Sequence, residues 1–256
     1  MRVAVSELEG FYASAMGAVA QEALSTKLTQ AWGTAEHLRV AGFGYTQPYL
    51  GVFTGAERMV AMSPAGAGIR AGGDVPAALV SECAWPLPDA SIDRLLILHG
   101  MEESADARRL LREAWRVLAD DGLMIIAVAN RRGPWAMVET SPFAAGQPYS
   151  RRQLDDALKA AMFGPTAHAT ALHFPPIRNK ALLRLAPTWE RLGATIEDWR
   201  LPPIFPNLAG VNLVEARKVS ALPISGSKAE VFRPGLLMPG RLGKASPANR
   251  VKKVRK

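Results

Sequence analysis

The sequence predicts an α/β fold: a doubly wound, mostly parallel, Rossmann-like sheet flanked by helices. Residues 38–128 alternate short apolar runs with connecting segments, which is typical of consecutive βαβ units. The run 92–98 is almost entirely apolar, as expected of a parallel strand that is covered on both faces. The run 38–41 ends in Gly42 and Gly44, one residue apart. That pattern predicts a buried strand and a tight turn that a ligand can approach closely.

The individual elements are predicted from apolar periodicity and from turn residues. Residues 11–32 show helical spacing. Asp120–Gly122 is predicted to end a second helix, over 105–118. Ser150, with Gln153 three residues later, predicts a capped helix start. Strands are predicted at 38–41, 58–62, 78–82, 92–98, 123–128 and 210–216, and helices at 11–32, 105–118, 150–163 and 180–192.

Length and charge divide the chain into two parts. Its 256 residues, 48% of them hydrophobic, suit one large domain with an appendage, predicted as residues 1–219. Residues 220–256 are rich in Pro, Gly, Lys and Arg and are predicted to be a disordered tail. Nine Lys or Arg and a single Glu in 221–256 account for the whole net charge of +8. The end of this tail, 244–256, could contact nucleic acid or anionic lipid weakly, or could simply be solvated.

Several classes of protein are disfavoured by what the sequence lacks. With Cys83 alone, neither an internal disulfide nor a cysteine zinc site is expected. His37, His99, His168 and His173 show no metal-ligand spacing with carboxylates, so no metal is expected. No apolar run reaches the roughly 18 residues that span a bilayer, and no secretory signal is evident. A cytoplasmic location is the simplest interpretation.

Five blocks of sequence carry a resemblance to a known family. They are Ala84–Asp93, His99–Glu102, Leu111–Leu118, Asp121–Leu123 and Pro148–Leu154. In this order they resemble the class I S-adenosylmethionine-dependent methyltransferases, type-11 group, clearly over 10–165 and loosely over 166–219. The resemblance implies a methyltransferase sheet and S-adenosyl-L-methionine as cofactor.

The resemblance also implies which residues meet the cofactor. The glycine turn would line its methionine part, the end of the second strand would meet the adenosine, and Glu82 would lie beside the adenine. The implied cofactor-binding residues are Tyr12, Gly42, Phe43, Gly44, Tyr45, Met62, Ser63, Glu82, Cys83, Ala84 and His99. The chain departs from the family at Val40 and Met62, where the family usually has acids, and at Thr46, where it usually has glycine.

The implied reaction is in-line methyl transfer to an unidentified small-molecule or lipid-like acceptor. His99 is the candidate catalytic base, although a histidine at a strand end can equally be a packed residue or a cofactor contact. The segment after the fifth strand would reach the substrate mouth, where Arg131 or Arg132 could hold an anionic group. Trp135 and Tyr149 could contact the acceptor there, or could instead cover the sheet.

Two functional readings remain open. The first is a working methyltransferase. The second is a catalytically weak or inactive methyltransferase-like protein that acts by binding or regulation, with a polyanion as one partner of its basic tail. A nicotinamide dehydrogenase is disfavoured, because Gln47 stands where the third glycine of the dinucleotide fingerprint belongs.

Overall fold

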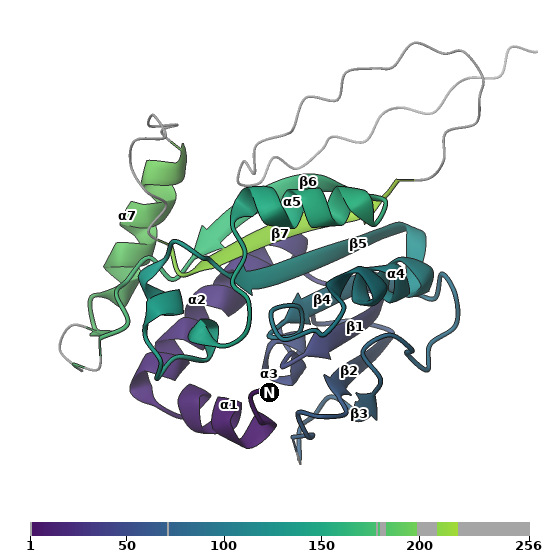
Figure 1. Cartoon of the computed structure of the whole chain (residues 1–256), viewed down its shortest axis with the longest axis horizontal. Coiled ribbons are helices and arrows are strands. Elements are labelled where there is room, and N and C mark those ends of the chain that lie inside the picture. Colours follow the sequence, from purple (N-terminus) through teal and green to yellow (C-terminus); the bar gives the residue numbers. More distant parts are fainter. Residues whose placement is uncertain (1, 71, 178, 180–182, 199–208, 220–256) are drawn as a thin grey trace, which may run out of the picture.

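The computed structural model of this chain describes all residues except 1, 71, 178, 180–182, 199–208 and 220–256. The tail predicted at 220–256 therefore lies outside the described residues. The described part forms one seven-stranded sheet in the order β3-β2-β1-β4-β5-β7-β6 (Figure 1). Strands β1 to β5 are parallel, and β7 runs antiparallel to both of its neighbours. This confirms the predicted doubly wound, mostly parallel sheet.

The strands match the apolar runs closely. They are β1 (Arg39–Gly44), β2 (Arg58–Pro64), β3 (Ala77–Val80), β4 (Ile92–Leu98), β5 (Leu118–Ala129), β6 (Phe163–Ala171) and β7 (Val211–Lys218). Strands β1 and β4 lie side by side, with Gly42 opposite Leu96. The sheet order reverses between these two strands, and the chain leaves their carboxyl ends toward opposite faces of the sheet.

Capping residues account for where two of the helices begin. They are α1 (Val5–Tyr12), α2 (Ala15–Trp32), α3 (Gln47–Leu50), α4 (Ala107–Val117), α5 (Arg151–Ala160) and α7 (Ala186–Asp198), with 3-10 turns η1 (Pro134–Met137) and η2 (Pro142–Ala144). The predicted helix over 11–32 is two helices, because the Ser14 hydroxyl accepts from Gly17 N and starts α2 afresh. Ser150 and Gln153 form the predicted capping box.

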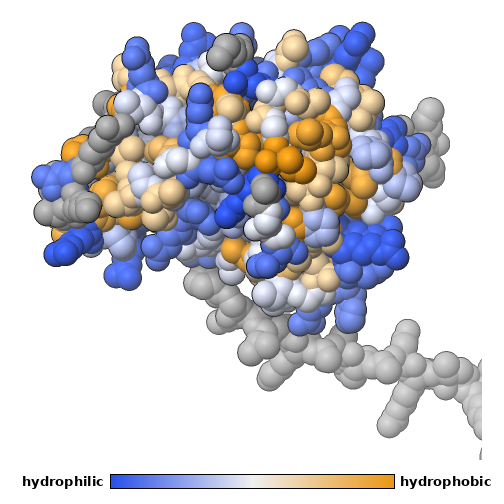
Figure 2. All heavy atoms as spheres, turned by 90° about the horizontal axis from the view of Figure 1, so that it is seen from below, coloured by the Kyte–Doolittle hydropathy of each residue, from blue (hydrophilic) through white to orange (hydrophobic). Residues whose placement is uncertain are grey.

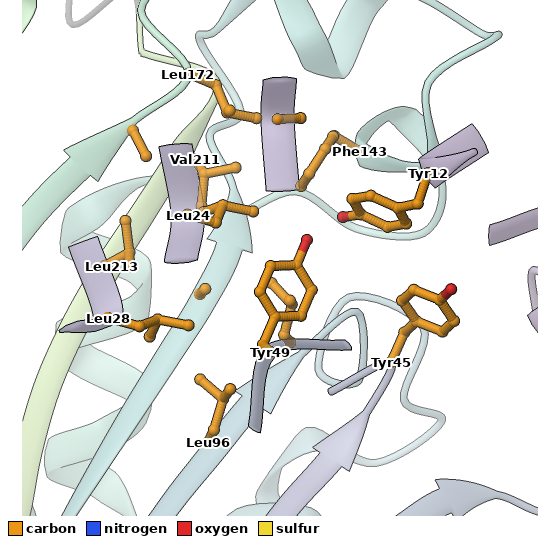
Figure 3. Close-up of a cluster of buried hydrophobic side chains, with 14 of the residues drawn as sticks. Tyr12, Leu24, Leu28, Tyr45, Tyr49, Leu96, Phe143, Leu172, Val211 and Leu213 are labelled. Atoms are coloured by element: carbon orange, nitrogen blue, oxygen red, sulfur yellow. The ribbon is translucent and has the colours of Figure 1, made fainter. Parts of the chain in front are cut away.

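Two hydrophobic cores cover the two faces of the sheet. One is built on α1 and α2, whose Leu24 and Leu28 face Leu96 and Leu213 (Figure 3). The other is built on α4 and α5. Seen from below, hydrophobic residues gather across the middle of the view and hydrophilic ones lie mainly around its margin (Figure 2).

Two sequence predictions need correction. Asp120–Gly122 do not form a separate turn; they lie inside β5, where the pairing with β4 shifts register between Ile92 and Arg94. Strand β6 was not predicted, because it contains Gly164 and Pro165 and most of its side chains are only half-buried. It pairs only with β7 and is an edge strand, the place in a sheet where proline is tolerated.

Candidate functional site

The glycines that the sequence assigned to a turn are the last residues of strand β1, where Gly42–Gly44 pair with Leu96–Leu98 of β4; the chain turns only after Gly44. We keep the name glycine turn for Gly42–Tyr45. Gly44 has a φ of +95°, and a Cβ there would collide with the carbonyl oxygen of Leu98. That same carbonyl accepts from Tyr45 N at 2.8 Å. Glycine is therefore required at 44 by the close crossing of two strand ends, whether or not a ligand is bound.

Gly42 makes room for a side chain of the same chain. A Cβ at Gly42 would collide with Thr46 Oγ1, so the threonine that replaces the usual third glycine fills the space above the first. Thr46 is fully buried, and its hydroxyl has no hydrogen-bond partner among the described residues. Buried hydroxyl groups ordinarily have a partner, so Thr46 Oγ1 is an unsatisfied polar atom at the end of β1.

Aromatic residues gather beside this turn. The rings of Tyr12 and Tyr45 stack, with centroids 5.3 Å apart and an interplanar angle of 11°. The Tyr12 hydroxyl lies 2.7 Å from Nε2 of His99, which has a φ of +50°. Phe143 lies against the His99 ring at 4.7 Å. Figure 3 shows Tyr12, Tyr45 and Phe143 converging from α1, the end of β1 and η2. The structure therefore brings together three of the residues predicted to meet the cofactor.

Protonation of the Tyr12–His99 pair follows from its burial. Burial raises the pKa of Tyr12 and keeps its hydroxyl protonated. Burial lowers the pKa of His99 from 6.5 to about 3, so the ring is neutral at pH 7. In the neutral ring, Nε2 either accepts from the Tyr12 hydroxyl or, as Nε2–H, donates to it, depending on the tautomer. This nitrogen has little basicity left for an acceptor, which weakens the reasoning that made His99 the catalytic base.

Glu102 is the functional candidate that the sequence reasoning missed. Its Oε1 accepts from Ala129 N at 2.9 Å, and its buried Oε2 has no hydrogen-bond partner within the described part of the chain. The residue is 7% exposed, and burial raises the pKa of its carboxyl group from 4.5 to about 7. The sequence did contain a signal for Glu102, because it is the last residue of the block His99–Glu102 that resembles the family. The sequence reasoning assigned the role of catalytic base to His99 instead.

Glu82, the predicted adenine neighbour, is already engaged by the chain itself. Its carboxylate pairs with Arg2 at 2.5 Å and accepts from Ser104 Oγ at 2.9 Å and Ala105 N at 3.1 Å. Burial alone would raise the pKa of Glu82, but these hydrogen bonds hold it below its ordinary value. A ligand that uses this carboxylate must displace Arg2 or share the group with it.

Arg2 belongs to a longer contact, which we call the N-terminal strap and define as residues 2–12. Val3 N donates to Glu103 Oε2 at 2.9 Å, and Val5 N donates to Ala67 O at 2.8 Å. With Arg2 on Glu82, and Tyr12 on both Tyr45 and His99, the strap touches the chain just beyond the carboxyl ends of β1, β2, β3 and β4. It closes over the edge where ligands bind in open α/β sheets.

Other predicted cofactor residues are spread around this edge. Phe43 and Met62 point into the core on the α4 side, where Trp85 stacks on Phe43 at 4.9 Å. Ser63 is buried at the end of β2. Cys83 is half-buried beyond β3, and burial raises the pKa of its thiol. The remaining predicted residue of this loop, Ala84, is exposed.

The predicted substrate residues do not form one pocket. Arg131 and Arg132 are exposed on the loop after β5. Trp135 is fully buried, and its Nε1 donates to Phe174 O at 2.8 Å, so it is a core residue. Tyr149 is half-buried, and burial followed by the nearby Glu102 charge raises its pKa.

A cavity of about 280 Å³ lies near them instead. It opens between the strap and the segment that carries η2, and none of the four predicted substrate residues lines it. Two exposed acids, Glu7 and Glu139, stand on opposite sides of it. Among the residues that the structure describes, no group of three or more His, Cys, Asp or Glu side chains could hold a metal. None of the described helices is long and apolar enough to cross a membrane.

Part of this site lies within a region that matches a known domain family. Residues 42–126 match the model of the methyltransferase domain family. The uncharacterized protein YafS of Escherichia coli K12 is 31% identical over 140 residues, which are 52% of this chain and 51% of YafS. The chain thus spans about half the length of this curated relative.

Comparison of structures gives the same fold. A S-adenosylmethionine-dependent methyltransferase of Thermotoga maritima has a TM-score of 0.55 at 17% identity, covering 84% of this chain and 96% of that one. Geranyl diphosphate C-methyltransferase of Streptomyces coelicolor, solved with S-adenosyl-L-homocysteine, has a TM-score of 0.51 at 17% identity, covering 77% of this chain and 80% of that one. The [4+2]-cyclase SpnF has a TM-score of 0.52 at 17% identity, covering 76% of this chain and 79% of that one. At these identities the likeness concerns the fold.

Proposed function

Because the chain belongs to the class I S-adenosylmethionine-dependent methyltransferase family, type-11 group, we propose that it transfers a methyl group from S-adenosyl-L-methionine to a small-molecule acceptor. The observation that carries the proposal is the match over 42–126, which contains the glycine turn and the ends of β1, β2, β3 and β4. YafS is an uncharacterized protein, so its similarity gives no information on activity. The structural neighbours support the fold alone.

The residues at the glycine turn suit a polar ligand of this kind. Thr46 Oγ1 and Glu102 Oε2 are buried oxygens without a partner among the described residues, just beyond β1 and β4. Leaving such atoms unpaired costs about 1–3 kcal/mol each, which a hydrogen-bonding ligand would recover. The space beside Gly42 and Gly44 is filled by Thr46 and by the Leu98 carbonyl, so the cofactor would contact this turn chiefly through Tyr45, with Tyr12 stacked on it. When bound, S-adenosyl-L-methionine supplies an activated methyl group on sulfur.

The chain's own part in the reaction is positioning and proton transfer. The N-terminal strap excludes water from the edge, and the Tyr12–His99 hydrogen bond fixes one wall of the site. An acceptor that carries a proton must lose it. We place that proton on Glu102 Oε2, because this oxygen is free of hydrogen bonds from the described residues and its pKa of about 7 suits proton transfer at neutral pH.

Titration calorimetry with S-adenosylmethionine and S-adenosylhomocysteine tests the proposal on wild type and Thr46→Val. Submillimolar binding by wild type is expected. Thr46→Val should weaken it by roughly tenfold, because a hydrogen bond of about 1–1.5 kcal/mol is lost. Thr170→Val, at a buried threonine on the edge strand β6 whose hydroxyl lies 2.9 Å from His173 Nε2, is the control for removing a buried hydroxyl and should bind as wild type does. Failure of wild type to bind either compound would refute the proposal.

A methyltransferase-like binding protein without turnover is the second candidate. The observation that favours it is Glu82, whose carboxylate is occupied by Arg2, Ser104 and Ala105. Met62 adds to this, since it stands in place of an acid and is buried in the core on the α4 side. The fold also admits chemistry other than methyl transfer, as the [4+2]-cyclase SpnF shows. Absence of cofactor binding in the same titration favours this candidate.

A further inference from the structure

Two pairs of adjacent arginines, separate in the sequence, lie next to each other where β5 ends. Arg131–Arg132 follow β5, and Arg151–Arg152 open α5. Hydrogen bonds hold the two segments side by side, because Tyr149 N donates to Ala129 O at 3.0 Å and Arg131 N donates to Tyr149 O at 3.3 Å. Figure 1 shows α5 beginning at this end of β5. All four arginines are exposed, and we call them the arginine cluster.

The arginine cluster is barely neutralised by the chain itself. Within the described part of the chain, the guanidinium groups of Arg131, Arg132 and Arg151 have no ion-pair or hydrogen-bond partner. Arg152 Nε lies 3.8 Å from Asp156 Oδ2, and the two side chains are 93% and 66% exposed. An ion pair of this kind is weak, because water screens it and both side chains must be held in place. The cluster can therefore meet an anion without first breaking a strong contact.

The other acids of this region lie elsewhere or have partners. Glu139 is the one acid between residues 129 and 153, and it lines the cavity beside the N-terminal strap. Asp155, on α5, has its Oδ1 2.7 Å from His168 Nε2. Glu103 accepts from Val3 N at 2.9 Å. The surface that the four arginines form therefore carries a local excess of positive charge.

The first turn of α5 carries the charge that the start of a helix disfavours. The amino end of a helix is the positive end of its dipole, so acids stabilise it and cations do not. Helix α5 begins with Arg151 and Arg152, has no acid in its first turn and is capped by the neutral Ser150. Helix α4, by comparison, is capped by Asp106. The cations of the cluster repel the dipole and one another, and a bound anion would relieve that repulsion.

The arginine cluster adjoins the buried carboxyl group that we place in proton transfer. Ala129 N donates to Glu102 Oε1 at 2.9 Å, and Ala129 O accepts from Tyr149 N. Tyr149 O then accepts from Arg131 N, so three consecutive hydrogen bonds join Glu102 to the cluster. A molecule that rests its anionic end on the cluster would therefore bring its other end to the sheet edge beside Glu102.

We propose that the arginine cluster binds a phosphate group of the methyl acceptor, an inference that rests on the proposed methyl transfer. The planar fork of donors on arginine matches the geometry of phosphate oxygens. A phosphate monoester carries nearly two negative charges and three acceptor oxygens, so it can engage several guanidinium groups, whereas a carboxylate carries one charge. A nucleic acid would need a longer row of cations, and Asp155 and Asp156 interrupt the row within α5. The acceptor is therefore a small phosphorylated molecule.

Titration calorimetry of the full chain with inorganic pyrophosphate, at constant ionic strength, tests the proposal. Wild type should bind pyrophosphate and should bind acetate far more weakly. Arg131→Gln/Arg151→Gln should weaken pyrophosphate binding at least about tenfold, because two charge-assisted hydrogen bonds are lost. Arg108→Gln/Arg112→Gln removes the same charge from two exposed positions on α4, so it is the matched control and should bind as wild type does. Titration of each protein with S-adenosylhomocysteine should give the same affinity, because the cluster does not hold the cofactor.

Thermal unfolding gives a second readout, since pyrophosphate should raise the melting temperature of wild type more than that of Arg131→Gln/Arg151→Gln. Absence of pyrophosphate binding by wild type would overturn the proposal, and so would an equal loss in both double variants. Single-stranded RNA that binds through the cluster and is not displaced by pyrophosphate would identify a polymer as the partner instead. Binding of S-adenosylhomocysteine without pyrophosphate refutes the phosphate site alone. The reverse result leaves an anion site but refutes its assignment to a methyl acceptor.

Discussion

The strongest quantitative prediction concerns the buried carboxyl group of Glu102. In Glu102→Gln the amide oxygen can still accept from Ala129 N, so the local hydrogen bond survives while the titrating group is lost. The pKa of Glu102 is about 7 in the folded protein against 4.5 for an ordinary glutamate. At 1.36 kcal/mol per pKa unit, the ionised carboxylate destabilises the folded state by about 3 kcal/mol once it is fully charged.

The sign of the effect follows from proton binding. Between pH 4.5 and 7 the folded state holds a proton on Glu102 that the unfolded state has released, so stability falls as pH rises. His99 acts in the opposite direction. Its folded pKa of about 3 lies below the ordinary 6.5, so its contribution to stability is lost as pH falls below 6.5. The two slopes oppose each other between pH 4.5 and 6.5. The stability of Glu102→Gln should therefore rise more steeply with pH than that of wild type in this range.

Urea unfolding measures this from pH 4.5 to 8. The stability of wild type minus that of Glu102→Gln should fall by about 3 kcal/mol across this range. Glu57→Gln, an exposed side chain next to the start of β2, should leave the shape of the curve unchanged. Parallel curves for wild type and Glu102→Gln would refute the reasoning, because they would mean that the carboxyl group ionises at its ordinary pH.

Three further predictions concern the walls of the site. Gly44→Ala should destabilise the protein by more than about 3 kcal/mol, because alanine disfavours the positive φ and its Cβ would clash with Leu98 O. An unchanged melting temperature in thermal unfolding would contradict this. Trp135→Ala should lower the free energy of unfolding in urea by about 3–5 kcal/mol, because the side chain is fully buried in the core. A loss below ~1 kcal/mol would favour the alternative that Trp135 contacts the acceptor. Tyr12→Phe should cost about 1 kcal/mol and shift the ring resonances of His99, since Nε2 loses its hydrogen-bond partner; unchanged histidine spectra would contradict the pairing.

The fold was predictable because its signals are local. The apolar run at 92–98 is β4 to the residue, and the Ser150 cap starts α5 where expected. Strand β6 could not be found, since an edge strand with half-buried side chains lacks a clear apolar pattern. The site was harder to predict, because its groups acquire their chemistry from contacts distant in sequence. Glu102 depends on Ala129, and Glu82 depends on Arg2, 80 residues away.

The N-terminal strap gives the site a kinetic property. A ligand can reach the edge under it only after the contacts of Arg2, Val3 and Tyr12 have parted. The observed association rate should then rise with ligand concentration and level off at the rate of strap opening. Slow arrival and slow departure would go together, so a ligand once enclosed would remain longer than its contacts alone imply.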